Sequence, residues 1–244
     1  MGKFISNFDT TAELAAFSAT TEFGRPHVSL TKDNSEVHFF EDPYKGHQYV
    51  EIGGLKWATM NVGATAVTDV GLYFSWGDIS GYTAAQVGSG EGQKFFGWLD
   101  YKYYSGAETM TKYNSTDGKK VLDLSDDAAR ANMGGLWRMP TAAEYAALGE
   151  AVNSTWTTDY QGSGVSGLVL TDKTDSSKVL FFPAAGRCDY GGVDYVRSYG
   201  FYWSSSVRSG DVQFAWDLDF DSSSVNWRST YYRYFGFAVR GVAD

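Results

Sequence analysis

Apolar and polar residues alternate most regularly between Val212 and Asp221, where each even-numbered position up to Phe220 is apolar and most odd-numbered positions are polar. An extended chain points successive side chains to opposite faces, so this pattern predicts a β-strand with one face in the core and the other in water. Shorter apolar runs predict further strands at residues 168–170, 179–183, 202–205 and 235–242. The C-terminal part of the chain is therefore expected to consist mainly of β-structure.

The N-terminal segment has its own pattern, which we interpret as an extension of the main domain. Thr10 and Glu13 have the spacing of a capping box and predict the start of a short helix. Alternation over residues 27–31 and 36–39 predicts two short strands. A helix and a hairpin of this size bury little apolar surface, so we expect residues 1–46 to pack on the main domain or to promote oligomerisation.

The main domain is expected to span residues 47–244. Gly53 and Gly54 separate two short β-like runs and predict a tight hairpin, because glycine tolerates the positive φ angles of such a turn. Residues 79–120 are polar, rich in Gly and Tyr, and without sustained periodicity. This segment predicts long irregular loops.

Two helices are predicted within the main domain. Ser125 is the expected N-cap of the first, which Gly134 ends. Thr141 opens the second in a capping box, with Tyr145 and Leu148 on one face.

The composition of the last third of the chain differs from that of an ordinary protein surface. From Val179 onward there is no Lys, Glu or Met, whereas Tyr, Ser and Asp are abundant and six of the nine Arg residues occur here. Tyr supplies rigid contact area, Ser and Asp supply adaptable hydrogen bonds, and Arg supplies planar recognition, as in antibody paratopes. We therefore interpret this segment as a binding face.

Charge and hydropathy exclude several classes of partner. The net charge of −9 disfavours binding to nucleic acid, which requires a basic surface. No apolar run approaches the length of about 20 residues needed to span a membrane. The N-terminus lacks the apolar core of a secretory signal peptide, so we expect no signal peptide and no membrane insertion.

No pattern of catalytic or metal-binding residues is evident. Cys188 is the only cysteine and cannot form an internal disulfide, and the three histidines lie in the first fifth of the chain, so we predict no catalytic residues and no cofactor. Asp217, Asp219 and Asp221 could supply oxygen ligands to Ca²⁺, but same-face positions on a strand lie about 6–7 Å apart. A solvated strand face without a metal is the favoured interpretation.

Six short motifs occur in order along the main domain and together carry a family resemblance. They are WATMNVG at 57–63, YFSWG at 73–77, WRMPT at 137–141, FPAAGR at 182–187, YWSSS at 202–206 and GFAVR at 236–240. The chain resembles the Fibrobacter-type major paralogous domain, a branch of the C-type lectin-like fold related to the formylglycine-generating enzymes. The resemblance implies an α+β domain with two helices, small antiparallel sheets, long loops, and paired N- and C-terminal strands.

The same resemblance implies a function, because this fold is the usual scaffold of the variable proteins of diversity-generating retroelements. In such proteins, adenine-directed mutagenesis rewrites Asn codons to Ser, Thr, Asp, Tyr, Arg, Gly, Val, Phe or Cys codons, but not to Lys, Glu, Met or Trp codons. The predicted variable region is residues 187–235. Its candidate ligand-binding residues are Asp189, Tyr190, Asp194, Tyr195, Ser198, Tyr199, Arg208, Ser209, Asp211, Asp217, Asp219, Asp221, Arg228, Ser229, Thr230, Tyr231, Tyr232 and Tyr234.

The run of bulky residues from Tyr231 to Phe235 cannot point entirely inward from an extended chain, which favours contact roles for its tyrosines. Arg233 is interpreted as a scaffold residue. The resulting hypothesis is a receptor-binding protein of a phage or prophage, located at a virion tail tip or on a cell surface, which binds a protein or glycan on a bacterial host and forms a homotrimer. The alternatives are a non-diversified adhesin, a carbohydrate-binding lectin, or a formylglycine-generating-type enzyme, which would require a second cysteine.

Overall fold

The computed structural model describes residues 27–30, 37–40, 42–107 and 109–244. Strands β1 (His27–Leu30) and β2 (Val37–Phe40) pair antiparallel, which confirms the two short strands predicted for the N-terminal segment. The helix expected to start at Thr10 lies outside the described residues.

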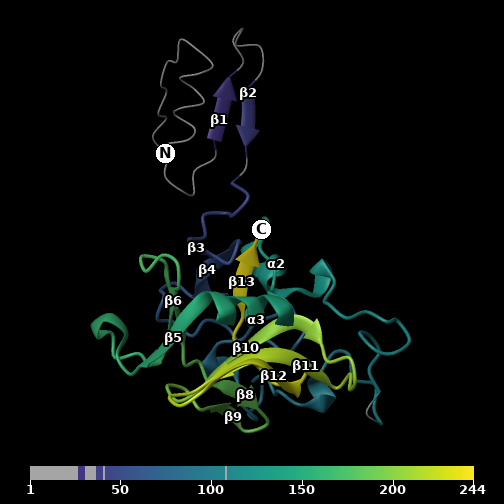
Figure 1. Cartoon of the computed structure of the whole chain (residues 1–244). Coiled ribbons are helices and arrows are strands. Elements are labelled where there is room, and N and C mark those ends of the chain that lie inside the picture. Colours follow the sequence, from purple (N-terminus) through teal and green to yellow (C-terminus); the bar gives the residue numbers. More distant parts are fainter. Residues whose placement is uncertain (1–26, 31–36, 41, 108) are drawn as a thin grey trace.

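The first and last strands of the main domain lie together in one sheet (Figure 1). Strands β3 (Tyr49–Ile52) and β4 (Leu55–Asn61) form the predicted hairpin. Gly53 and Gly54 join them with φ angles of 62° and 80°, which glycine adopts without steric penalty. Strand β13 (Arg240–Ala243) pairs with β4 and confirms the expected pairing of N- and C-terminal strands.

A second sheet has the order β5-β6-β7 and leaves β5 at its edge. Its strands are β5 (Val152–Thr157), β6 (Gly167–Asp172) and β7 (Val179–Pro183), which pair antiparallel in sequence order. The predicted runs at 168–170 and 179–183 fall within it.

A third sheet forms the lower half of the domain in Figure 1, with β11 at its centre. It consists of β10 (Gly200–Val207), β11 (Phe214–Phe220) and β12 (Val225–Tyr232). The small hairpin of β8 (Arg187–Asp189) and β9 (Gly192–Asp194) lies below it. These two sheets and the turns that join their strands contain the predicted variable region up to Tyr232.

Helix α2 (Ala128–Met133) begins two residues later than predicted. Its N-cap is Asp127, whose side chain accepts a hydrogen bond from the Arg130 amide at 2.9 Å, whereas Ser125 lies in a preceding 3₁₀ turn. Asp127 also accepts a hydrogen bond from the distant Met139 amide at 2.8 Å. This tertiary contact, which the local sequence does not reveal, selects the cap.

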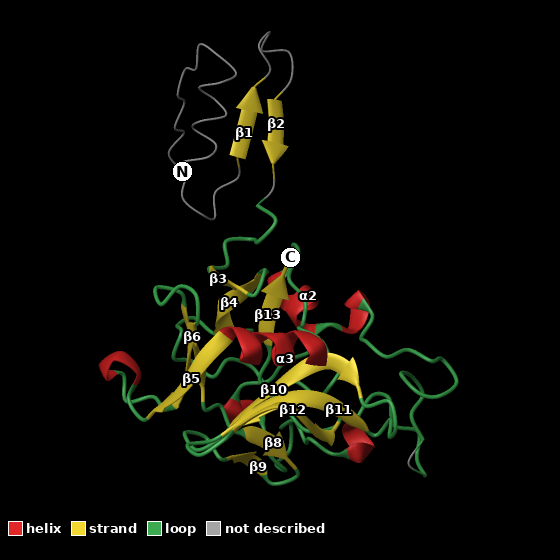
Figure 2. Ribbon diagram, in the orientation of Figure 1, coloured by secondary structure: helices red, strands yellow, loops and turns green. Residues whose placement is uncertain are grey.

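Helix α3 (Ala142–Ala151) has the predicted capping box between Thr141 and Glu144. Tyr145 and Leu148 are both buried, which confirms the predicted apolar face. The helix lies against the β10-β11-β12 sheet, as Figures 1 and 2 show.

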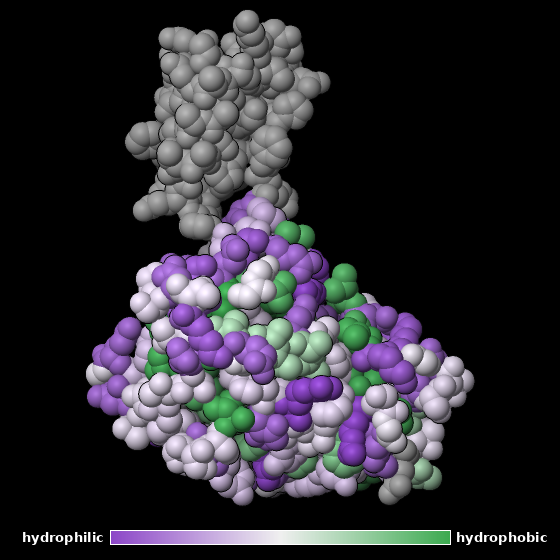
Figure 3. All heavy atoms as spheres, viewed as in Figure 1, coloured by the Kyte–Doolittle hydropathy of each residue, from purple (hydrophilic) through white to green (hydrophobic). Residues whose placement is uncertain are grey.

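The architecture is α+β, with two α-helices among the described residues and small antiparallel sheets joined by long loops (Figure 2). Two large groups of buried side chains form the core. One contains Trp76, Trp137 and Trp203, and the other surrounds α3 and contains Trp57 and Phe182. On the side seen in Figure 3, hydrophilic and intermediate residues cover most of the main domain and hydrophobic residues form small scattered groups.

Two buried arginines connect the sheets to neighbouring segments. Arg233 donates a hydrogen bond from Nε to the Tyr101 hydroxyl at 2.8 Å, and its guanidinium lies 4.5 Å from the Trp76 ring centre. Arg240 donates to the backbone carbonyls of Ala58 at 2.8 Å and Phe181 at 2.9 Å. Buried guanidinium groups are stable only when such acceptors replace water, so both side chains act as fixed scaffold elements.

Candidate ligand-binding face

The predicted ligand-binding residues differ widely in exposure. Those that are exposed are Tyr190, Asp194, Tyr195, Ser198, Tyr199, Ser209, Arg228 and Tyr232. Those that are partly buried are Asp189, Arg208, Asp211, Asp219, Asp221, Ser229, Thr230 and Tyr231. Asp217 and Tyr234 are buried, with exposed fractions of 1% and 6%, so the expectation that their side chains face solvent is wrong.

Three of the predicted residues, Tyr190, Tyr232 and Tyr234, belong to a group of contacting aromatic side chains that we call the aromatic cluster. It consists of Phe95, Trp98, Tyr104, Tyr190, Phe214, Tyr232 and Tyr234. The buried Tyr234 ring contacts the rings of both Tyr190 and Tyr232, at ring-centre distances of 5.1 Å and 5.7 Å. Tyr234 therefore supports the two exposed tyrosines.

The loop before Tyr104 supplies the part of the aromatic cluster that the sequence did not predict. Trp98 lies 5.6 Å from Tyr232 and 4.7 Å from Tyr234, and Phe95 lies 5.2 Å from Tyr190. The neighbouring Leu99 is 90% exposed. The only sequence signal for this loop was its density of aromatic residues, because it has no periodicity and lies about ninety positions from the predicted variable region.

A second group surrounds Arg187 at the start of β8, and we call it the Arg187 cluster. The guanidinium carbon lies between 4.9 and 5.6 Å from the ring centres of Tyr195, Phe201, Tyr231 and Phe235. A cation over aromatic faces is attracted by their negative charge density. Arg187 thereby joins the 195–199 turn to strands β10 and β12.

The turn held by Arg187 has an unusual backbone. Tyr195 and Arg197 have φ angles of 63° and 69°, a left-handed conformation that is uncommon for residues other than glycine. Tyr199 stacks on Phe201 at 5.9 Å and contacts Tyr195 at 5.3 Å. Strained backbone of this kind persists where the surroundings fix it, and here it presents Tyr195 and Tyr199 to solvent.

The odd-numbered face of β11 is covered, contrary to the predicted solvated face. Asp217 lies opposite Trp203 on β10 and Ser229 on β12. Because β11 is the central strand, Asp217 shares the buried environment of Ala215, whereas Asp219 and Asp221 are partly buried. The alternation correctly predicted the strand, but the prediction that its odd-numbered face lies in water was wrong.

Burial raises the pKa of two of the three carboxyl groups in this row, those of Asp217 and Asp219. Neither oxygen of Asp217 has a hydrogen-bond partner among the described residues, and burial raises its pKa well above the usual value. Burial also raises the pKa of Asp219, whereas hydrogen bonds from Ser223 lower that of Asp221. No group of three His, Cys, Asp or Glu side chains in the described ranges is arranged to hold a metal ion.

Asp189 belongs with the Arg187 cluster, because its carboxylate lies 4.0 Å from the Arg187 guanidinium, whereas Thr230 and Arg228 lie elsewhere. Thr230 lies opposite Trp216, and the Arg228 guanidinium is 5.2 Å from the Trp216 ring, on the even-numbered face. Arg208 lies 5.4 Å from Phe214, close to the aromatic cluster. The predicted site is therefore divided between both faces of the sheet.

Cys188 is fully buried in a small apolar group, and burial raises the pKa of its thiol.

Within the part of the chain that the structure describes, no helix has the length and apolar character needed to cross a bilayer.

Comparison with known proteins gives one finding for this region. A family model described as a domain of unknown function (DUF8237) matches residues 170–242, from within β6 to β13. Neither the curated proteins nor the solved structures gave a match. The matched segment includes β8 to β12 and so contains both the Arg187 cluster and most of the aromatic cluster.

Proposed function

We propose that the chain is a ligand-binding protein, not an enzyme, in which a C-type lectin-like scaffold displays a variable C-terminal face. In this proposal, the protein is one of the variable proteins of diversity-generating retroelements. It acts at a phage tail tip or a cell surface and recognises a protein or glycan on a bacterial host. It forms a homotrimer, and a measurement of its molar mass by light scattering tests this part of the proposal.

The observation that carries the proposal is the group of exposed tyrosines on a fixed framework. Tyr190, Tyr195, Tyr199 and Tyr232 are between 37% and 49% exposed. Each contacts another aromatic ring that limits its freedom. Rigid exposed tyrosines contribute contact area at low entropic cost, which is typical of recognition surfaces.

Support for the scaffold comes from the way in which the sequence motifs contact one another. The Trp76 indole donates a hydrogen bond to the Ser204 carbonyl at 2.8 Å, and the Trp203 indole donates to the Phe74 carbonyl at 2.9 Å. Phe237 stacks on Trp203 at 4.2 Å. Three motifs that lie far apart in the sequence thus stabilise one another in the core, and one of them, at 202–206, is a fixed part of the predicted variable region. Substitutions at exposed positions of the face therefore need not disturb this core.

The alternative of a formylglycine-generating-type enzyme receives less support. Such chemistry needs a reactive cysteine pair, whereas the one cysteine is buried and its raised thiol pKa disfavours the thiolate.

The decisive experiment is to sequence the DNA adjoining this reading frame. We expect a near copy of the codons for residues 186–240 that differs almost only where the copy has adenine, together with a reverse transcriptase gene. If no such copy exists in the genome, the diversification is refuted and an ordinary adhesin becomes the better interpretation.

A further inference from the structure

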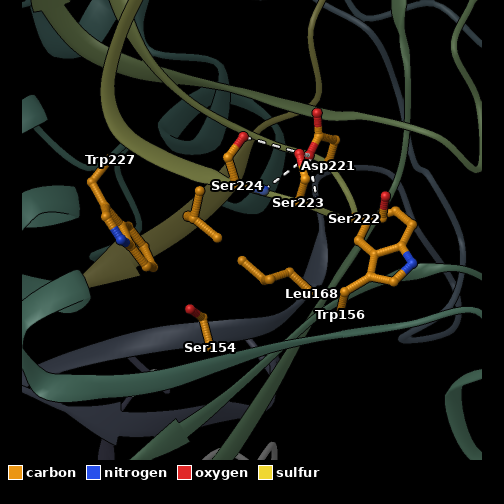
Figure 4. Close-up of a pocket in the computed structure, with 9 residues that line it drawn as sticks. Ser154, Trp156, Leu168, Asp221, Ser222, Ser223, Ser224 and Trp227 are labelled. Atoms are coloured by element: carbon orange, nitrogen blue, oxygen red, sulfur yellow. Dashed lines mark hydrogen bonds between the residues drawn. The ribbon is translucent and has the colours of Figure 1, made fainter.

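A groove of about 350 Å³ lies between the edge strand β5 and the turn that joins β11 to β12 (Figure 4). Its volume is within the range of about 300–1,000 Å³ that is usual for small-molecule sites. Trp156 from β5 and Trp227 from β12 lie on opposite sides, with Leu168 between them, as Figure 4 shows. We call this site the tryptophan groove.

The turn above the tryptophan groove is fixed by its aspartate. The Asp221 carboxylate accepts hydrogen bonds from the Ser223 amide at 2.6 Å, the Ser223 hydroxyl at 2.7 Å and the Ser224 amide at 2.9 Å. In contrast, the hydroxyls of Ser154 and Ser222 line the groove without a hydrogen-bond partner in the described part of the protein. These two groups remain available to a ligand.

Both indoles are held in place by the core. Trp227 packs so closely over Gly149 of α3 that a Cβ atom there would lie 2.7 Å from its ring. Trp156 contacts Phe220 edge-on at 6.4 Å. Neither tryptophan is fully buried, and both line the groove. A preformed pair of aromatic walls reduces the entropic cost of binding.

The chemistry of the lining indicates one class of ligand. The nine lining residues combine apolar indole surface with several hydroxyls and one carboxylate, and they include no basic side chain. Anionic ligands are therefore disfavoured. A gluco-configured pyranose has an apolar face of C–H bonds, which stacks on an indole, and a rim of equatorial hydroxyls, which pair with serine and carboxylate oxygens.

We propose that the tryptophan groove binds a neutral, gluco-configured disaccharide unit of a glycan. Ser154, Ser222 and Asp221 bind its hydroxyls, and Trp156 and Trp227 contact its apolar face. The site shares no residue with the aromatic cluster, although its residues from Asp221 to Trp227 lie within the predicted variable region.

The test is calorimetric titration of the full chain with cellobiose and N,N′-diacetylchitobiose, with tryptophan fluorescence as a second readout. We expect saturable binding of at least one of them, unaffected by EDTA. β-1,4-Galactobiose, whose axial hydroxyl interrupts the flat face, is expected to bind at least about tenfold more weakly. The proposal is overturned if neither gluco-configured sugar binds, if EDTA abolishes binding, or if galactobiose binds equally well.

Variants locate the binding in the groove. Ser154→Arg introduces a long side chain into the groove from an exposed strand position and should weaken binding by at least about tenfold. Asn153→Arg is the matched control, because neighbouring residues of a strand point to opposite faces. Trp156→Ala should also weaken binding, whereas Trp156→Tyr, which retains an aromatic face, should restore part of it. Equal affinities of Ser154→Arg, Asn153→Arg and the unchanged protein would place the sugar elsewhere.

Discussion

At the scale of single residues, Asp217 shows that the position of a side chain in the fold, and not its polarity, decides whether it is exposed to water. A carboxyl group that is 1% exposed and without a hydrogen-bond partner is costly to ionise, because burial removes water from the charged form. The raised pKa means that the folded protein holds this proton at pH values where the unfolded chain has lost it. Folding stability must then decrease as pH rises above the unfolded-state pKa, until the pH passes the folded-state pKa.

We therefore expect Asp217→Asn to gain stability relative to the unchanged protein as pH rises. The amide has nearly the same shape and does not ionise, so the difference between the two unfolding free energies should grow from pH 5 to pH 8. Urea unfolding at both pH values measures it. Parallel pH profiles would show that Asp217 ionises as readily in the folded protein as in the unfolded chain.

Asp221→Asn is the matched control, for which we expect the opposite effect on the free energy of unfolding. Hydrogen bonds from Ser223 lower the pKa of Asp221, so its ionised form stabilises the folded protein above the unfolded-state pKa, and this stabilisation is lost as pH falls through the folded-state pKa. The substitution should lower stability at neutral pH and have less effect in acid.

At the scale of elements, the 195–199 turn depends on a side chain from another strand. Its backbone bonds include those from the amides of Ser198 and Tyr199 to the Tyr195 carbonyl, each at 3.0 Å. Two further backbone bonds, from the Arg197 amide to the Ala184 carbonyl and from the Gly186 amide to the Tyr199 carbonyl, each at 2.8 Å, tie the turn to the segment before β8. The contact of Arg187 with Tyr195, Phe201 and Tyr231 adds a side-chain connection to β10 and β12.

Arg187→Met should loosen this turn while leaving the sheets folded. Methionine retains the apolar stem but removes the cation, and cation–π contacts are worth about 0.5–2 kcal/mol. We expect a loss of stability of that order and faster hydrogen exchange at the amides of Ser198 and Tyr199. Arg208→Met, which removes a cation over Phe214 alone, should leave exchange in the turn unchanged.

The elements themselves were largely predictable from sequence. The capping box at Thr141, the glycine pair at Gly53 and Gly54, and the alternation in β11 each encode local geometry that needs no distant partner. The start of α2 was not predictable, because Asp127 becomes the cap through its bond with Met139. Local signals fail where a tertiary contact selects between adjacent candidates.

At the scale of the whole molecule, segments distant in sequence form the aromatic cluster. Trp98 and Phe95 come from the long loop, Tyr190 from the turn between β8 and β9, and Tyr232 from β12. Exposed aromatic residues beside others that exclude water are typical of interaction hot spots. The loop thus enlarges the predicted face beyond the predicted variable region.

Replacing both Tyr190 and Tyr232 by Ala should reduce binding to host cells without unfolding the protein. Truncation of hot-spot aromatics costs about 2 kcal/mol or more, or roughly thirtyfold in affinity. Flow cytometry with the labelled protein measures binding, and thermal unfolding checks the fold. Leu136→Ala, at an exposed apolar position outside the variable region, is the control and should bind normally. Retained binding by the double variant would argue against this surface as the contact.

The sequence by itself indicated the α+β class, both helices and many of the strands, because periodicity, caps and residue type are local properties. It did not indicate β5, β8, β9 or β12. Tertiary structure decided which residues are accessible. It buried Asp217 and Tyr234, placed Arg228 and Thr230 on the opposite face from Asp217, and added Trp98 to the aromatic cluster. Burial depends on what packs against each face of a strand, and alternation along one strand carries no information about its neighbours.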